Sequence, residues 1–314
     1  MPKLSRNKLI TIAFAVLFFV ALPFLATSSN TKKIYVETSA SGTQNGSSEH
    51  PFKTIKQAMK EADEKTEIHI SKGTYEENVD MKKGVKIFGE DEDDVVIESD
   101  DKDEPTVFMR HKTTINKVTI KKGKYGVKVD DDAKASIVKC VVKDSRGAGI
   151  KIKGDGKHKD DMVSISKTVV KENDGPGIFV PEKRRISITE SEIVENKGDG
   201  IDLGKNISAW IADSSIKNNK KSGMKLVIDG ASIWTKSNSI RNNNREGVEV
   251  SWYGGAGKIN IAKSKFFKNE RFAVARVQRG YFNSGLRGQY LTFDDKNVFG
   301  ENIFGDISKI FVIK

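Results

Sequence analysis

The sequence predicts an all-β solenoid of short stacked coils, and the first observation behind this prediction is a repeated glycine. A glycine followed by an apolar, a variable and an apolar residue recurs six times, at intervals of 23, 28, 23, 23 and 24 residues. The copies begin at Gly126, Gly149, Gly177, Gly200, Gly223 and Gly247. A repeat of this length is one structural unit that buries its apolar face only against its neighbours.

The second observation is a pair of polar positions at fixed places before each glycine. Asparagines stand four residues before the glycine or its equivalent Ala273, at Asn173, Asn196, Asn219, Asn243 and Asn269. Small hydroxyl residues stand five residues earlier, at Thr168, Ser191, Ser214 and Ser264, with Asn238 breaking the row. Asparagine tolerates the left-handed backbone of a sharp turn, and its amide can bond to a copy one coil away. We therefore expect the asparagines at the turns, stacked in a ladder.

Within each repeat, the apolar residues predict three very short strands separated by turns. They alternate with polar residues, so that one side of each strand faces the core and the other faces solvent. Equivalent residues of successive coils should lie about 4.8 Å apart, as in a parallel sheet. Residues 106–277 contain no long helical pattern, which argues against alternating strands and helices. They also lack the six-residue subperiod of a left-handed β-helix and the leucine pattern of a leucine-rich repeat.

These repeats resemble the right-handed parallel β-helix of the pectin-lyase-like superfamily, including extracellular "right-handed β-helix region" proteins. The opening is also similar, with PFKTIKQA at 51–58 and IHISKGTYEE at 68–77. The resemblance covers residues 33–277 and implies a right-handed parallel β-helix solenoid. It leaves the activity open, because the superfamily includes lyases, hydrolases, epimerases, phage tailspikes and adhesins. The paired aspartates of polygalacturonases and the calcium cluster of pectate lyases are not found in this sequence.

The ends of the chain predict a leader, an N-terminal cap and a C-terminal cap or tail. Three basic residues precede the uncharged run 9–26, which predicts a signal peptide or a retained membrane anchor within residues 1–30. Either would place the solenoid outside the cytoplasm. Thr54 and Gln57 form a capping-box pattern before a short amphipathic helix, which we expect to cap the solenoid. We therefore divide the chain into the leader 1–30, the N-terminal cap and first coils 31–105, the regular coils 106–280, and the cap or tail 281–314.

The formal charge is +11, and its distribution is uneven. Residues 110–160 carry fifteen Lys and Arg against six Asp. A basic surface outside the cell favours anionic partners such as a polysaccharide or another cell-envelope polymer. Outward lysines also solubilise strands and block edge pairing, so a purely protective role is the alternative. Few grouped aromatic residues and the expected export argue against a nucleic-acid partner. The single cysteine, Cys140, occupies the small-hydroxyl position of its coil, where we expect it to be buried.

The outward positions of the glycine strands supply candidate catalytic residues. Asp202, Lys225 and Glu249 fall on three consecutive coils. The two carboxylates would be about 9.6 Å apart at the backbone, twice the strand spacing and near the upper limit for an inverting pair. Lys225 between them would serve as the base of a lyase. The alternative is a solvated ladder of alternating charges.

Four further residues are candidates for binding substrate. Lys151 and Phe179 precede the charged trio in the same outward row, and Trp252 and Tyr253 lie in a glycine-rich insertion directly after it. Flat aromatic rings suit the faces of sugars, although a hydrophobic clasp over the coil edge is an equal alternative for the last two. No metal ligands or cofactor motif are evident. Calcium lacks a supporting motif, because the spacing in the acidic stretch 89–105 matches no calcium loop.

Three functions remain open from the sequence. The first is an exported or membrane-anchored β-helix protein that binds polysaccharide or another anionic envelope polymer. The second is a carbohydrate-active enzyme, a lyase, glycosidase or epimerase, with its groove along one parallel sheet. The third is a structural or protein-binding surface solenoid.

Overall fold

The computed structural model describes residues 31–154, 161–276 and 290–308. These belong to one compact unit within Thr31–Lys314. The expected leader at 9–26 and parts of the expected C-terminal segment, 281–289 and 309–314, therefore lie outside the described residues. Within the described ranges, no helix has the length and apolar character needed to cross a membrane.

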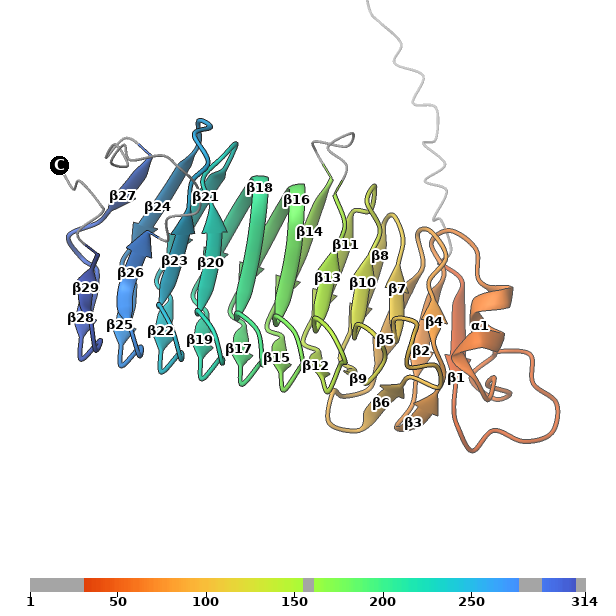
Figure 1. The fold of residues 1–314 in the computed structure, drawn as a ribbon. Coiled ribbons are helices and arrows are strands. Elements are labelled where there is room, and N and C mark those ends of the chain that lie inside the picture. Colours follow the sequence, from red (N-terminus) through yellow and green to blue (C-terminus); the bar gives the residue numbers. More distant parts are fainter. Residues whose placement is uncertain (1–30, 155–160, 277–289, 309–314) are drawn as a thin grey trace, which may run out of the picture. The chain divides into compact units, whose positions relative to one another are not determined.

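The chain winds as a parallel β-helix in which each coil contributes to three faces (Figure 1). We call them face 1, face 2 and face 3, in the order in which a regular coil visits them. Face 1 holds the glycine strands: β4 (Val79–Asp80), β7 (Val107–Met109), β10 (Val127–Val129), β13 (Ile150–Ile152), β16 (Ile178–Thr189), β18 (Ile201–Ala212), β20 (Met224–Val227), β23 (Val248–Ser251), β26 (Phe272–Arg276) and β29 (Gly305–Ile307).

The next two strands of each regular coil lie on face 2 and then on face 3. Face 2 contains β1 (Lys33–Val36), β2 (Glu67–Ile70), β5 (Lys86–Gly89), β8 (Thr113–Asn116), β11 (Ala135–Val138), β14 (Met162–Ser166), the later parts of β16 and β18, β21 (Ser232–Lys236), β24 (Lys258–Ala262) and β27 (Leu291–Phe293). Face 3 contains β3 (Gly73–Glu76), β6 (Val95–Glu98), β9 (Thr119–Lys121), β12 (Val141–Lys143), β15 (Val169–Lys171), β17 (Glu192–Val194), β19 (Ser215–Lys217), β22 (Ser239–Arg241), β25 (Lys265–Phe267) and β28 (Val298–Gly300).

Strand pairing confirms the predicted register, with one difference in two coils. Ile201 pairs with Met224 and Met224 with Val248, so apolar residues stack from coil to coil inside the solenoid. In β16 and β18, however, the expected first and second strands merge into one strand of 12 residues each. Their connections have equal length, so the two backbones stay paired around the bend, for example at Glu182 and Lys205.

The repeated glycine is required by the close approach of neighbouring coils. A Cβ atom on Gly200 would lie 2.6 Å from the carbonyl oxygen of Gly223 and 2.8 Å from Nδ2 of Asn219. A Cβ on Gly223 would meet the next coil in the same way, at 2.7 Å from the oxygen of Gly247. Any larger residue would push the glycine strand away from the asparagine ladder.

The asparagine ladder is confirmed, but the expected left-handed residue lies one position earlier. Nδ2 of Asn219 donates to Oδ1 of Asn243 at 3.1 Å, and the asparagines themselves do not adopt a positive φ. Instead Asn218 (φ 57°) and Glu195 (φ 59°), which directly precede ladder asparagines, make the turn. Such a backbone costs roughly 1–2 kcal/mol for a residue with a side chain. The ladder offsets this cost, because each amide oxygen also accepts a backbone N–H of the neighbouring coil.

A second ladder of small polar residues runs along the corner between face 2 and face 3. The backbone N–H of Thr168 donates to Oγ of Ser191, and the N–H of Ser191 donates to Oγ of Ser214, both at 3.2 Å. Cys140 enters this ladder through its N–H, 3.4 Å from Oγ1 of Thr168, and is 1% exposed. The prediction that Cys140 is a buried ladder residue is confirmed.

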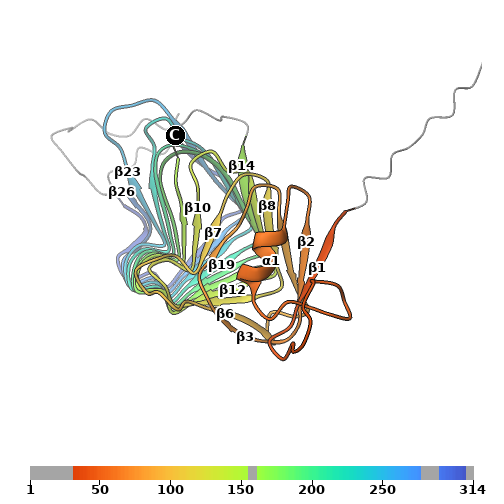
Figure 2. The same cartoon turned by 90° about the vertical axis from the view of Figure 1, so that its right-hand side faces the viewer.

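The predicted N-terminal helix is α1 (Ile55–Glu61), which lies across the near end of the coils in Figure 2. Its capping box is confirmed, since Thr54 and Gln57 exchange both hydrogen bonds. The carboxylate of Glu77 adds a second cap by accepting the backbone N–H groups of Ile55 and Lys56 at 2.7 and 2.8 Å.

Beside α1, the segment 46–52 covers the outer edge of strand β1. The N–H groups of Tyr35 and Glu37 donate to the carbonyls of Gly46 and Phe52, and Phe52 donates back to Tyr35, all at 2.9 Å. The first strand of the stack is thus hydrogen-bonded along both of its sides.

Candidate functional site

The outward row of face 1 stacks in register as predicted. It runs through Phe108, Lys128, Lys151, Phe179, Asp202, Lys225 and Glu249, each paired with the next. Within it, the Lys151 ammonium lies 5.9 Å from the ring centroid of Phe179 and 4.8 Å from that of Tyr125, whose hydroxyl it contacts at 3.1 Å. Lys151 and Phe179, both predicted to bind substrate, therefore contact each other on the sheet.

The three predicted catalytic residues fall into two separate contacts. Lys225 donates to both carboxylate oxygens of Asp202, at 2.9 and 3.1 Å. Glu249 is only 2% exposed, and its Oε2 accepts the hydroxyl of Ser222 at 3.1 Å. The same hydroxyl lies 3.3 Å from Oε2 of Glu246. The carboxylates of Glu246 and Glu249 thus both contact the hydroxyl of Ser222, next to the ion pair of Lys225 and Asp202.

Two buried carboxylates of this site, Asp199 and Glu246, are absent from the sequence-based set. Each is 4% exposed. Oδ1 of Asp199 accepts the backbone N–H of Ser222 at 2.9 Å, and burial raises the pKa of the Asp199 carboxyl. Arg271 lies 3.5 Å from Glu246. Asp199, Ser222 and Glu246 each directly precede a repeated glycine, so a fixed position in the repeat marks all three.

The two aromatic residues of the predicted insertion have different surroundings. Trp252 packs against the core, its Nε1–H donates to the Gly255 carbonyl at 2.8 Å, and the guanidinium of Arg276 lies over its ring. Tyr253 is 38% exposed, and the Lys205 ammonium lies 4.5 Å from its ring centroid. Only Tyr253 therefore offers substantial ring surface to solvent.

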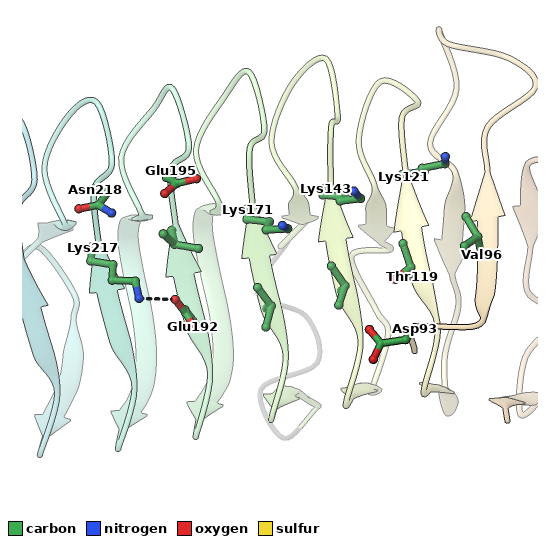
Figure 3. A pocket seen from close by; sticks show the side chains of 13 residues that line it. Asp93, Val96, Thr119, Lys121, Lys143, Lys171, Glu192, Glu195, Lys217 and Asn218 are labelled. Atoms are coloured by element: carbon green, nitrogen blue, oxygen red, sulfur yellow. Dashed lines mark ion pairs between the residues drawn. The ribbon is translucent and has the colours of Figure 1, made fainter. Parts of the chain in front are cut away.

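Face 3 carries a groove of about 640 Å³ whose residues come from six consecutive coils (Figure 3). Its lining consists of Asp93, Val96, Thr119, Lys121, Val141, Lys143, Val169, Lys171, Glu192, Val194, Glu195, Lys217 and Asn218. Two outward rows build it. Val96, Thr119, Val141 and Val169 pair in register as a largely aliphatic floor, and lysines line one side.

The lysine side of the groove holds like charges on neighbouring strands. Lys121, Lys143 and Lys171 pair in register on three consecutive coils. At the start of this row Lys121 forms a 2.5 Å ion pair with Glu98. The two following lysines lie 3.6 and 3.7 Å from the carboxylates of their sequence neighbours. Favourable cross-strand pairs contribute about 0.2–1 kcal/mol each to a sheet, whereas like charges directly opposite each other destabilise it.

The position of these lysines in the repeat marks the row in the sequence. Lys143 and Lys171 stand two residues before the corner positions Ser145 and Asn173. Further along face 3, the row continues through Val194 to Lys217, whose ammonium forms a 2.6 Å ion pair with Glu192 of the neighbouring outward row, as Figure 3 shows. The run of three in-register lysines thus begins in the basic segment 110–160 and extends beyond it to Lys171.

A group of three carboxylates, Asp130, Asp131 and Asp132, also lies in the part of the chain that the structure describes. Their ligand atoms fall within 4.8 Å of one another. Lys153 lies 3.2 Å from Asp130 and 3.9 Å from Asp131. An ammonium already offsets part of the charge of this turn.

Comparison with known proteins agrees with the observed architecture. Residues 106–266 match the family model described as "Right handed beta helix region". No curated protein matches the sequence. Similar solved structures include the pectate lyase Pel9A, with 12% identity, a TM-score of 0.55, and coverage of 88% of this chain and 78% of that one.

Two further structures show the same likeness. The A-module of the Azotobacter vinelandii mannuronan C-5 epimerase AlgE4 has 13% identity and a TM-score of 0.52, with coverage of 82% of this chain and 93% of that one. An alginate lyase from Paenibacillus sp. str. FPU-7 has 11% identity and a TM-score of 0.54, with coverage of 88% and 99%. At these identities the likeness concerns the fold.

Proposed function

Because this chain belongs to the right-handed β-helix family, whose model matches just over half of it, we propose that it binds an anionic polysaccharide on face 3. The observation that carries the proposal is the in-register row of Lys121, Lys143 and Lys171 beside an aliphatic floor. The resemblance in fold to proteins named for pectate, mannuronan and alginate supports this class of ligand.

The geometry suits a polymer that runs across the coils. The solenoid places the backbone of one lysine about every 4.8 Å along a rigid sheet, and a polyuronate carries a carboxylate on each sugar. A bound polyanion would relieve the repulsion within the lysine row. The valine and threonine floor would contact the apolar edges of the sugars, so charge and apolar contact would act together.

The proposal includes a location outside the cytoplasm. The basic start and the uncharged run 9–26 support export, with attachment to a membrane if this leader is retained. Cell-envelope polymers with phosphate or carboxylate groups would then be accessible ligands.

Binding of polygalacturonate, alginate and uncharged dextran to the chain from Thr31 onward tests the proposal, since these residues form a unit with its own core. We expect Lys143→Glu/Lys171→Glu to weaken polyuronate binding roughly tenfold or more, about 1.4 kcal/mol. The control Lys53→Glu/Lys83→Glu makes the same change in net charge at exposed residues far from the groove. Equal losses in both variants, or equal binding of dextran, would contradict a site on face 3.

A second candidate function is a carbohydrate-active enzyme, a lyase, glycosidase or epimerase, on face 1. The buried carboxylates Asp199, Glu246 and Glu249 beside the Asp202–Lys225 pair favour it, because buried carboxyl groups supply general acids and bases. In a glycosidase, Asp202 and Glu249 would be the acid and the base. In a lyase, Lys225 would be the base. Tyr253 and Trp252 would border the substrate.

Incubation with the same polysaccharides, followed by unsaturated-product absorbance and reducing ends, tests the enzyme. Product that disappears in Asp202→Ala, Lys225→Ala or Glu249→Gln would establish it. Binding without product would leave the binding function alone. Neither binding nor product would favour a structural or protein-binding solenoid.

A further inference from the structure

Two of the three tryptophans of this chain stand exposed on neighbouring strands of face 2. Trp210 on β18 is 42% exposed and Trp234 on β21 is 48% exposed, and the two pair in register. Tryptophan is usually largely buried, and an exposed aromatic pair on a rigid surface is a common feature of binding sites. The outward position of both residues follows from the alternation with inward Ala209, Ile211 and Ile233.

The row that contains these tryptophans is free of charged residues over eight consecutive strands. It runs through Thr114, Ser136, Ser164, Ser187, Trp210, Trp234, Asn260 and Thr292. Ser136 and Ser164 share a 3.0 Å hydrogen bond, and Thr292 donates to Asn260. The row thus offers hydroxyl groups beside the two indole rings, whereas Asn260, which follows Trp234, is only 6% exposed. Its chemistry differs from that of the lysine row on face 3.

Small residues flank the pair on one side. Ser208 and Ser232, two positions before the tryptophans, pair in register on the same two strands. Short side chains beside an indole leave its surface open to a ligand that lies along the row. Both tryptophans are more than 40% exposed in this arrangement.

We propose that face 2 is a second binding surface, specific for an uncharged sugar chain that runs across the coils. Pyranose rings present an apolar C–H face, which stacks on indole, and equatorial hydroxyls, which hydrogen bond to serine and threonine. Two indoles one strand apart, at about 4.8 Å, give such a chain a continuous stacking platform. The row itself contains no cation, and three cations on these strands, Arg185, Lys236 and Lys258, stand in the neighbouring rows. The row therefore offers ring stacking and hydroxyl contacts instead of the in-register lysines of face 3.

Tryptophan fluorescence titrations with cellohexaose, xylohexaose, mannohexaose and chitohexaose test this inference. The Trp252→Phe background leaves Trp210 and Trp234 as the emitters. We expect a saturable change with at least one of these neutral oligosaccharides. Binding measured by calorimetry should fall roughly tenfold or more in Trp210→Ala/Trp234→Ala and recover largely in Trp210→Phe/Trp234→Phe, which keep the rings.

Alginate binding to the same variants separates this site from the proposed one on face 3. We expect Trp210→Ala/Trp234→Ala to bind alginate as the parent does, and Lys143→Glu/Lys171→Glu to bind the neutral oligosaccharide as the parent does. Circular dichroism and thermal unfolding confirm that each variant folds. Failure of all four oligosaccharides to bind, or equal binding in the double alanine variant, would overturn the proposal. A concentration-dependent dimer that the double alanine variant abolishes would assign the surface to a second copy instead.

Discussion

Asn196 and Asn219 are joined by two hydrogen bonds that end on one oxygen atom. Oδ1 of Asn219 accepts Nδ2–H of Asn196 at 3.0 Å and the backbone N–H of Asn196 at 3.1 Å. Nδ2 of Asn219 in turn donates to the carbonyl of Ile193 at 3.2 Å and to the next asparagine of the ladder. One fully buried amide therefore satisfies backbone and side-chain groups on both neighbouring coils.

Removal of this amide should destabilise the solenoid strongly. Asn219→Ala removes the acceptor of the buried Asn196 N–H, one of the three acceptors around Nδ2 of Asn196, and a donor to the carbonyl of Ile193. Each group left unsatisfied costs about 1–3 kcal/mol. We expect the free energy of unfolding, measured in urea, to fall by about 3 kcal/mol or more. Asn244→Ala, whose side chain is half-buried, is the control and should change it by less than about 0.5 kcal/mol. Similar small losses in both variants would refute the structural role of the ladder.

Replacement of a repeated glycine by alanine should destabilise the solenoid, because neighbouring coils approach closely there. In Gly200→Ala the new Cβ would overlap the carbonyl oxygen of Gly223 and Cγ2 of Ile216, at 2.6 and 2.7 Å. Overpacking of this kind costs about 1–3 kcal/mol. Thermal unfolding should show a lower midpoint than wild type. An unchanged midpoint would show that neighbouring coils can separate without loss.

The thiol of Cys140 should resist chemical modification in the native protein. Burial raises its pKa to about 12, so the reactive thiolate is scarce at neutral pH. We expect dithionitrobenzoate to release no thionitrobenzoate within minutes at about pH 8, and to react fully in denaturant. Rapid labelling of the native protein would show that the corner between face 2 and face 3 opens readily.

Asp199 should make stability depend on pH in a defined direction. Burial raises the pKa of this carboxyl above its ordinary value of 3.8, so the folded state favours the protonated form. Its stabilising contribution is complete below pH 3.8 and is lost as the pH rises through the raised pKa. Asp199→Asn stays uncharged and retains an oxygen that can accept the Ser222 N–H.

Paired urea unfolding curves at about pH 4 and pH 8 test this expectation. The variant should gain stability relative to wild type as the pH rises. A constant difference between the two proteins at both values would show that Asp199 titrates normally.

The sequence predicted those parts of the molecule that depend on local periodicity. Alternating apolar residues identified the three strands of each coil, and fixed polar positions identified both ladders, including Cys140. The capping box at Thr54 and Gln57 was equally local. The strand pattern and the ladder positions recur from coil to coil, so each copy supports the interpretation of the others.

Contacts between coils were less accessible from the sequence. The left-handed residue proved to be the one before each ladder asparagine, because the amide is needed for inter-coil bonds. Burial of Asp199 and Glu246 depends on how the corners close over face 1, and exposure of Trp210 and Trp234 depends on the small residues beside them.

The covered edge of strand β1 has a consequence for self-assembly. A parallel stack could in principle grow without limit, because its terminal strand is a template for another chain. Here the segment 46–52 already uses backbone groups of Tyr35 and Glu37 on the outer side, and α1 lies over the adjacent core. The length of the stack is therefore fixed at this end by the polypeptide itself, and a second molecule arriving there finds a closed surface instead of a nucleus for a fibre.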